Sequence, residues 1–193
     1  MLEFALQKYP STFRLKDGKE CVVRPLKESD EVGFHEFHLE IPEDERMFIK
    51  HRVTDQALFH EWCSEIDYER NLPLLVLANN KIIADGTLHQ RAGGWKRHIG
   101  LVSILTLPDY RGRGIASHLL SELVEIARHS GLVRLEAEFN GDRGSLSRAL
   151  ASRGFRELVR LPKYVQDMHC KHHDYVLMGR DLLTDEEYAS AGD

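Results

Sequence analysis

A loop rich in glycine and arginine is the stretch of this sequence whose residue types and spacing point most directly to chemistry. It reads Arg111-Gly112-Arg113-Gly114-Ile115-Ala116 and separates an apolar run from a helical pattern. Unpaired backbone N–H groups and the positive end of the helix dipole converge at such a helix N-terminus. Glycines let an anion approach the backbone because they lack a Cβ, and the two arginines add positive charge. The loop predicts a phosphate site, best matched by a pyrophosphate.

The loop is framed by two elements that must hold it in place. The β-branched and apolar residues from Ile104 to Leu107 predict a buried strand, which Pro108 ends. Beyond the loop, apolar residues recur at helical spacing as far as the stop signal at Gly131. These residues are Ile115, Leu119, Leu123 and Ile126. The helix N-terminus therefore faces the loop.

Arg-x-x-Gly-x-Ala between a strand and an amphipathic helix resembles the acyl-CoA signature of the GNAT superfamily of N-acyltransferases. The resemblance implies acetyl-CoA as co-substrate, with the loop amides on its pyrophosphate and the preceding strand's backbone on its pantetheine arm. The residues implied to bind it are Leu105, Thr106 and Leu107 on the strand, and Arg111, Gly112, Arg113, Gly114, Ile115, Ala116 and Ser117 on the loop and helix.

Two other phosphate-binding motifs fit the loop poorly. The segment 112–117 is one residue short of a dinucleotide fingerprint, and Ser117 stands where a third Gly or Ala belongs. Residues 108–111 separate it from the strand, and no second run of strand–helix alternation completes a dinucleotide fold. A P-loop is excluded because no Gly-Lys-Ser/Thr follows. The remaining alternative is a helix N-terminus that binds nothing.

The order of predicted elements matches the same family: a mixed α/β fold with a central, mostly antiparallel twisted sheet and helices on both faces. The elements are a hairpin over 12–24, helices starting at Ser29 and Asp55, strands over 72–78, 82–89 and 98–107, the central helix, a strand over 132–139, a short helix over 145–152, and strands over 155–161 and 175–181. Buried stripes are expected at Phe34, Phe37 and Ile41, and at Leu58, Trp62 and Ile66. The charged stretch 43–53 has no clear assignment.

Further segments carry the resemblance beyond the loop. The run Val22-Val23-Arg24-Pro25-Leu26 is similar to the family's opening strand, and Gly154-Phe155 to its late Gly-Phe pair. The run from Ile66-Asp67-Tyr68 to Val76 resembles, more specifically, the acyltransferase domain of bacterial protein-lysine acetyltransferases. We therefore expect an irregular or weakly docked lead-in over 1–11, one acyltransferase domain over 12–182 and a tail over 183–193.

Acyl transfer to an amine needs a neutral amine, an oxyanion donor and a proton for the leaving thiolate. The resemblance implies a strand N–H near Leu105 or Leu107 as the oxyanion donor. Relatives carry a Glu early in the central strand and a Tyr five residues before the Gly-Phe phenylalanine. Leu101 and Leu150 occupy these positions here, so the usual base and acid are missing.

Glu138 is the residue that we expect to deprotonate the amine, with Glu136 as the alternative. Both lie on one face of a strand, and Glu138 is nearer the C-terminal end, where ligands gather in open α/β sheets. A solvated or structurally paired strand face is the competing interpretation. His89 and His98 are alternative bases, or structural histidines.

Two further polar clusters have a functional and a structural interpretation. Glu40, Glu43, Asp44 and Glu45 lie where relatives build the acceptor side, so they either attract an amine or form a solvated face. The run His169-Cys170-Lys171-His172-His173 contains metal-binding residue types, but no other cysteine lies at zinc-site spacing. We expect a solvated loop there and no metal.

Composition is that of one soluble domain, with 193 residues, 42% hydrophobic and 30% charged. A net charge of −5 argues against nucleic acid as a main partner and favours cationic acceptors such as amines. The three cysteines are widely separated, so no disulfide framework is expected. The sequence shows neither a signal peptide nor a membrane-spanning run, so we expect a cytoplasmic protein that binds no membrane.

The expected function is that of an acetyl-CoA-dependent N-acetyltransferase that acts on a primary amine, either a protein lysine or N-terminus or a small molecule. The alternative is a catalytically silent protein of the same fold that binds CoA as a sensor or partner-binding module. The missing base and acid at Leu101 and Leu150 motivate this alternative. A homodimer stays open.

Overall fold

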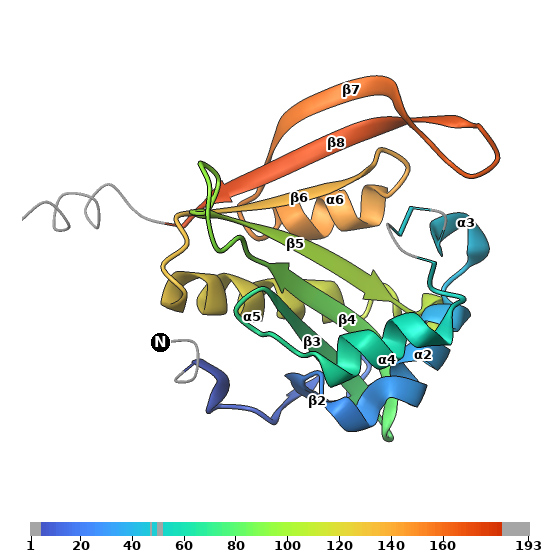
Figure 1. Ribbon diagram of the computed structural model, residues 1–193, viewed down its shortest axis with the longest axis vertical. Coiled ribbons are helices and arrows are strands. Elements are labelled where there is room, and N and C mark those ends of the chain that lie inside the picture. The colour runs from blue at the N-terminus through green and yellow to red at the C-terminus, as the bar shows by residue number, and fades with distance from the viewer. Residues whose placement is uncertain (1–4, 47, 50–51, 183–193) are drawn as a thin grey trace, which may run out of the picture.

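An eight-stranded sheet forms the centre of the molecule in the computed structural model, which describes residues 5–46, 48–49 and 52–182 (Figure 1). The strand order is β1-β2-β3-β4-β5-β6-β8-β7, and all neighbours are antiparallel except β5 and β6. The strands are β1 (Ser11–Arg14), β2 (Glu20–Pro25), β3 (Asn71–Ala78), β4 (Lys81–His89), β5 (Ile99–Thr106), β6 (Arg134–Asn140), β7 (Arg156–Gln166) and β8 (His172–Asp181). The mixed, mostly antiparallel fold expected from the sequence is confirmed.

Helices cover both faces of this sheet. They are α2 (Glu31–Glu40), α3 (Glu43–Arg46), α4 (Gln56–Ser64), α5 (Ile115–His129) and α6 (Gly144–Ala151), with 3-10 turns η1 (Glu28–Asp30) and η2 (Pro108–Tyr110). Figure 1 shows α2 and α4 on one side of the sheet and α5 and α6 on the other. In the part of the chain that the structure describes, no helix is long and apolar enough to cross a membrane.

Gly86 shows toward which face of the sheet each side chain of β4 points. A Cβ built on Gly86 of β4 would lie 3.2 Å from Leu119 of α5, so Gly86 faces α5. Because side chains alternate along a strand, Asp85 and Thr87 point to the opposite face. We call this the front face. It is the face of the sheet that α2 and α4 cover in Figure 1.

The N-terminal ends of two helices differ in how well the sequence predicted them. Ser29 does not cap α2, because it lies inside the 3-10 turn η1, and Asp30 precedes the helix instead. Asp55 caps α4 as expected, since its carboxylate accepts a hydrogen bond of 3.0 Å from the N–H of Ala57.

The buried stripe of α4 lies one residue away from the predicted stripe. Phe59 and Cys63 are the buried side chains of this helix, whereas Leu58, Trp62 and Ile66 are only half-buried. Phe59 is the better core residue here because its ring packs edge-on against an aromatic ring of α2, at a centroid distance of 5.7 Å.

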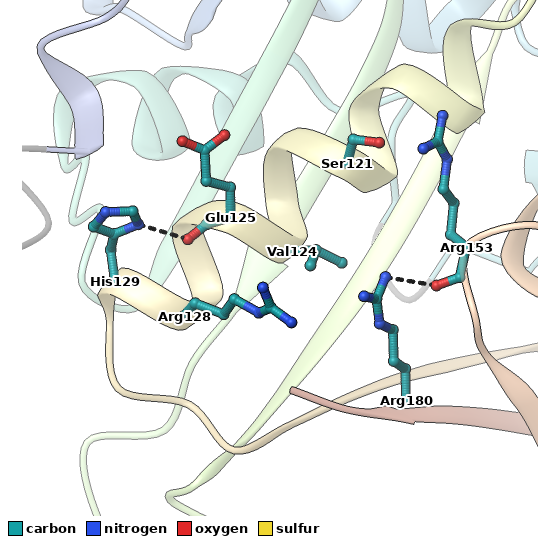
Figure 2. A pocket seen from close by; sticks show the side chains of 7 residues that line it. All are labelled: Ser121, Val124, Glu125, Arg128, His129, Arg153 and Arg180. Atoms are coloured by element: carbon teal, nitrogen blue, oxygen red, sulfur yellow. Dashed lines mark hydrogen bonds between the residues drawn. The ribbon is translucent and has the colours of Figure 1, made fainter. Parts of the chain in front are cut away.

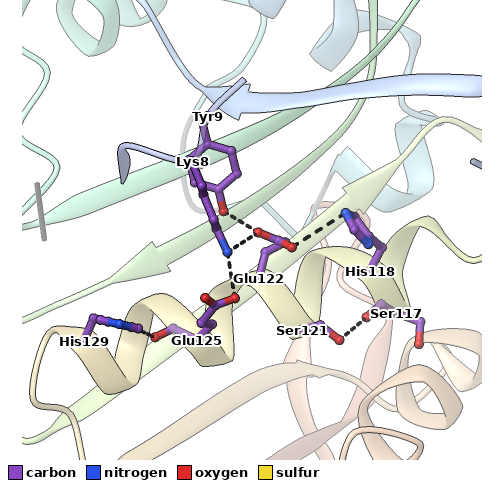
Figure 3. Close-up of polar contacts among 8 residues, drawn as sticks. All are labelled: Lys8, Tyr9, Ser117, His118, Ser121, Glu122, Glu125 and His129. Carbon is purple, nitrogen blue, oxygen red and sulfur yellow. Dashed lines mark hydrogen bonds and ion pairs between the residues drawn. The ribbon is translucent and has the colours of Figure 1, made fainter. Parts of the chain in front are cut away.

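Among the described residues before β1, Lys8 and Tyr9 contact α5. The Lys8 ammonium lies 2.8 Å from the Glu122 carboxylate and 2.7 Å from that of Glu125, and the Tyr9 hydroxyl donates to Glu122 at 2.6 Å (Figure 3). Burial raises the pKa of Glu122, but the hydrogen bonds from Lys8 and Tyr9 outweigh it, so the net shift is downward. The expected tail over 183–193 lies outside the described residues.

The last two strands are longer than predicted. The pairing of β7 with β8 extends to Gln166 and His172, so only residues 167–171 connect them. The register shifts between Leu161 and Val165, where Lys163 has a φ of +52°. This irregularity interrupts the period-2 pattern that identifies a strand in a sequence.

A substitution at Gly100 of β5 can test how tightly side chains are packed on the face of the sheet opposite the front face. A Cβ built on it would lie 2.7 Å from a Leu132 methyl and 2.9 Å from methyl groups of Leu135 and Leu88, which are all buried. We predict that Gly100→Ala lowers the free energy of unfolding by about 1–3 kcal/mol, because an overpacked core must shift. Urea titration measures it. Gly93→Ala is the matched control, since nothing lies within 4 Å of its Cβ and its stability should hold; equal effects of the two variants would refute this account of the core.

Candidate functional site

Strands β5 and β6 pair over a short distance and then diverge. Their parallel register joins Ile99 to Arg134, Gly100 to Leu135 and Leu101 to Glu136, and in the described residues it goes no further. Both strands continue beyond it, so the edge of β5 toward β6 lacks a strand partner there. Backbone polar groups at such an edge are available to a ligand. We call this opening the β5–β6 gap.

Two arginine side chains show which backbone groups of β5 face the gap. Arg143 donates to the carbonyl of Ile104 at 3.3 Å, and Arg111 donates to the carbonyl of Thr106 at 3.0 Å. The N–H of Leu107 instead donates to Ile83 of β4 at 3.0 Å. Since pairing directions alternate along an antiparallel strand, the N–H of Leu105 also points toward β4.

This arrangement corrects the expected oxyanion donor. Leu107 is not available because its N–H is bonded to β4, and Leu105 faces the same way. The groups that point into the gap belong to Ile104 and Thr106. A sequence pattern identifies the strand but not which of its alternating N–H groups is free, because that depends on pairing with β4.

The loop after β5 has the geometry of an anion site. Gly112 has a φ of +75°, and Gly114, the residue that precedes α5, has a φ of +96°. In the described structure no hydrogen bond reaches the backbone N–H groups of 112–117, including those of the first turn of α5. The amide of Arg111 is the exception among the predicted donors, because it is bonded to the carbonyl of Pro108.

Both arginines of the loop are engaged by carboxylates from distant segments. Arg111 lies 2.7 Å from Glu45 of α3, and Arg113 lies 2.5 Å from Asp17 of the β1–β2 turn. The carbonyl of Arg113 also accepts a hydrogen bond from the N–H of Lys16 in that turn. The arginines therefore tie the loop to its surroundings, and the glycine amides are left as the open anion donors.

Glu45 bridges two arginines at the end of the β5–β6 gap. Besides Arg111, its carboxylate lies 3.9 Å from Arg143, which follows β6. Burial lowers the pKa of the Arg143 guanidinium, and Glu45 partly offsets that shift. Of the four acidic residues expected on the acceptor side, Glu45 is thus on the cofactor side, Glu40 pairs with Lys81 at 2.7 Å, and Glu43 and Asp44 are exposed.

A second group of arginines lies beside α5, around a pocket that Ser121, Val124 and Glu125 also line (Figure 2). Arg153 donates to the Ser117 hydroxyl at 2.9 Å, and Arg180 donates to the carbonyl of Arg153 at 2.6 Å. Burial lowers the pKa of Arg180, and repulsion from Arg128 and Arg153 lowers it further. Within the described residues no ion pair joins these three arginines to a carboxylate. The pocket that they line also contains Glu125, so this side of α5 carries both positive and negative side chains.

The predicted carboxylates of β6 lie on the front face. Glu136 is opposite Leu101, where the strands are still paired, whereas Glu138 lies beyond the last pair, beside the gap. The Tyr175 hydroxyl of β8 donates to Glu138 at 3.1 Å. Burial and the charge of Glu138 raise the pKa of Tyr175 to about 12, so this hydroxyl keeps its proton at neutral pH.

Asp85 of β4 is a front-face carboxylate that the sequence analysis missed. It is 5% exposed, and in the described structure its side-chain partner is the Thr87 hydroxyl, at 3.1 and 3.2 Å. Burial raises the pKa of Asp85 to about 7, and the hydrogen bond from Thr87 offsets only part of that shift. The signal was available, because a charged residue within the apolar run 82–88 is unusual for a buried strand.

The histidines have different environments. His89 contacts Asn71 at 2.7 Å and the Ser103 hydroxyl at 3.3 Å on the front face, whereas His98 is exposed in the turn before β5. His173 lies between Asp142 and Asp167, at 2.6 and 2.9 Å, and both carboxylates raise its pKa.

Leu101 and Leu150, which the family resemblance aligns with a catalytic Glu and Tyr, differ in burial. Leu150 is fully buried in α6, and Leu101 is half-buried on the front face. Among the described residues, no group of three His, Cys, Asp or Glu side chains is arranged to hold a metal ion.

Solved structures share this fold. The GNAT domain of S. lividans PAT is 19% identical, with 89% of this chain and 96% of that one covered at a TM-score of 0.73. The Salmonella typhimurium putative acetyltransferase yncA, solved with acetyl-CoA, is also 19% identical, with 84% and 94% covered at 0.73. A ribosomal-protein-alanine N-acetyltransferase from Brucella melitensis is 21% identical, with 83% and 99% covered at 0.73.

The family assignment comes from the sequence itself. The model of the acetyltransferase (GNAT) family matches residues 34–155, a range that contains the β5–β6 gap, the glycine loop and α6. This range is more than half of the 193-residue chain. Together with the shared fold, the match shows that the chain belongs to the GNAT family of acetyltransferases.

Proposed function

We propose that this protein transfers the acetyl group of acetyl-CoA to a primary amine, on a protein or on a small molecule. The observation that carries the proposal is the row of open N–H groups over 112–117 at the end of the β5–β6 gap. A pyrophosphate needs several convergent donors, and a long acyl arm needs an unpaired strand edge. Acetyl-CoA offers both chemical features in one molecule.

The proposed cofactor contacts follow from this geometry. The amides from Gly112 to Ser117 take the pyrophosphate, and the β5 backbone from Ile104 to Leu107 lies along the pantetheine arm. The gap-facing N–H of Ile104 or Thr106 stabilises the oxyanion that forms on the thioester carbonyl. Arg143 and Arg111, which now bond the carbonyls of these residues, must turn away as the arm enters.

The reaction itself requires two protons to leave the amine nitrogen. An alkylammonium is mostly charged at neutral pH and must first become a neutral amine. The nitrogen then forms its bond to the carbonyl carbon, the C–S bond breaks, and the thiolate takes a proton. Glu138 is our candidate for the first deprotonation, because it lies beside the gap and Tyr175 holds its carboxylate.

The comparisons leave the acceptor open. One similar protein is described as acting on an alanine of a ribosomal protein, and another as a putative phosphinothricin N-acetyltransferase, which is a small-molecule activity. In this chain the front face carries Glu136 and Glu138, which suit a cationic acceptor of either size. We place the reaction in the cytoplasm.

The direct test has two steps. We expect acetyl-CoA to bind in a calorimetric titration, and a thiol-release assay against amino acids, polyamines and basic peptides to show acceptor-dependent turnover. Absence of binding at millimolar acetyl-CoA would overturn the proposed function. Binding without turnover above hydrolysis would instead favour the silent CoA-binding module that the sequence left open.

The glycine loop yields a sharper prediction. Gly112→Val and Gly114→Val should each abolish detectable CoA binding, because a β-branched side chain opposes a positive φ, at a cost of about 1–2 kcal/mol, and blocks the anion's approach. Calorimetry and circular dichroism measure binding and folding. Gly94→Val is the matched control: its φ is +84°, nothing lies within 4 Å of its Cβ, and it is at the other end of β5. Normal CoA binding by the loop variants would place the pyrophosphate elsewhere.

Glu138→Gln should lower turnover by about tenfold or more with CoA affinity unchanged, as expected for loss of a general base. Steady-state kinetics over pH 6 to 9 measures the effect. Glu136→Gln is the comparison, because Glu136 lies where β5 and β6 are still paired and is the alternative base. A larger loss with Glu136→Gln would reverse the assignment, and full activity of both variants would remove β6 from the proton transfer.

A further inference from the structure

Burial in the core that the structure describes is energetically unfavourable for the Asp85 carboxylate. Its neighbours along β4 are buried and apolar, and a buried carboxylate that has one hydroxyl partner is costly. The pairing register places it between Leu75 of β3 and Leu105 of β5, and neither can solvate a charge. A residue that weakens the fold in this way commonly has a role in function.

The position of Asp85 connects it to the proposed reaction site. Its register partner Leu105 belongs to the strand segment that borders the β5–β6 gap, and both side chains lie on the front face. Thr87 lies two residues after Asp85 on β4 and is directly opposite Ser103 of β5. Opposite residues of an antiparallel pair have Cβ atoms about 5 Å apart, so their hydroxyls can share a hydrogen bond.

These groups form a row of polar side chains on the front face, in which Thr87 and Ser103 are neighbours by strand register. It starts at the buried Asp85, passes through the Thr87 hydroxyl and reaches Ser103, which is exposed. Ser103 in turn contacts His89 at 3.3 Å, and His89 contacts Asn71 at 2.7 Å. The row thus joins a buried acid to a solvent-exposed hydroxyl beside the gap.

We propose that Asp85 is the buried proton acceptor of the acetyl-transfer site, reached from the acceptor nitrogen through the hydroxyls of Ser103 and Thr87. The inference rests on the proposed function. Two protons leave the nitrogen, and Asp85 accepts the second, which is released as the N–C bond forms. Ser103 is the group that contacts the acceptor, and Asp85 acts through it.

The protons balance in this scheme. The ammonium gives one proton to Glu138, and the nitrogen gives a second, through Ser103 and Thr87, to the Asp85 carboxylate. The C–S bond breaks with its electron pair on sulfur, and the thiolate takes one proton. The other returns to water, from Asp85 by way of Thr87, Ser103 and His89. No oxidant, reductant or further reactant is needed.

The surroundings of Asp85 suit a proton acceptor that works near neutral pH. Burial raises its pKa to about 7, and no charged side chain contributes to that shift. Titratable groups on the packed elements include His89 on β4 itself, Glu136 and Glu138 on β6, the buried His38 and the half-buried His35 on α2, and the buried Cys63 on α4. Burial lowers the pKa of His38 to about 4, so this ring is neutral when Asp85 titrates.

The kinetic test compares pH profiles of kcat/KM from pH 5.5 to 9 with an acceptor found in the thiol-release assay. Wild type should lose activity as the pH falls through the pKa of Asp85. Asp85→Asn should lose this limb and at least about tenfold of the rate at pH 8, the scale of general-base contributions. Thr87→Val should behave similarly, and Thr87→Ser, which keeps the hydroxyl, should restore the profile.

A stability measurement separates this role from a structural one. With its raised pKa, Asp85 holds a proton in the folded state between about pH 4 and 7, where the unfolded chain has released it. Wild-type stability therefore falls relative to Asp85→Asn as the pH rises through that window, so the variant should melt at a higher temperature at pH 8. The two melting temperatures should converge toward pH 4.

Asp181→Asn is the matched control, since Asp181 pairs with Arg134 and Arg156 at the end of β8 and should keep the wild-type kinetic profile. If Asp85→Asn keeps the acid limb and the rate, Asp85 is not the acceptor, whatever its stability. A loss of rate with Thr87→Val that Thr87→Ser fails to restore would overturn the relay. Absence of wild-type turnover would instead count against the proposed function, and the stability comparison would still report on the buried acid.

Discussion

The short parallel pairing of β5 with β6 is the constraint on which the rest of the site depends. After Leu101 and Glu136 the strands separate, and β5 continues with one edge that has no strand partner in the described structure. Such an edge is costly unless its polar groups are satisfied. Guanidinium groups of Arg143 and Arg111 bond two of its carbonyls, and both arginines share Glu45. An arm with amide groups can take over these contacts without opening the sheet.

The chain has a net charge of −5, but several of its positive side chains gather beside the loop after β5. Positive charge is concentrated at the ends of β5 and α5, where Arg111, Arg113 and Arg153 meet the helix N-terminus. Carboxylates from α3 and the β1–β2 turn neutralise part of it, so what distinguishes the site is the set of open amides. Orientation of backbone donors, rather than net charge, gives such a site its specificity for phosphate.

Much of this architecture could be predicted because its signals are local. The glycine loop, the amphipathic pattern of α5 and the order of helices and strands along the chain follow from short stretches of sequence. The features that were missed depend on distant partners. Glu45 could not be assigned to Arg111 without the path of α3, and the free N–H groups of β5 could not be chosen without its pairing to β4. The buried stripe of α4 contains Phe59 and not the predicted Leu58, because a ring from α2 packs against Phe59.

Leu101 and Leu150 now have a physical interpretation. Leu150 is fully buried on α6, and as an apolar side chain it carries no desolvated hydroxyl there. Polar groups lie instead on the two strands next to β5, with Asp85 and Thr87 on β4 and Glu138 on β6. A thiolate is a good leaving group, so the chemistry places its strictest demand on removing protons from the amine. In the mechanism that we propose, Glu138 and Asp85 take these protons, so no acid on α6 is required.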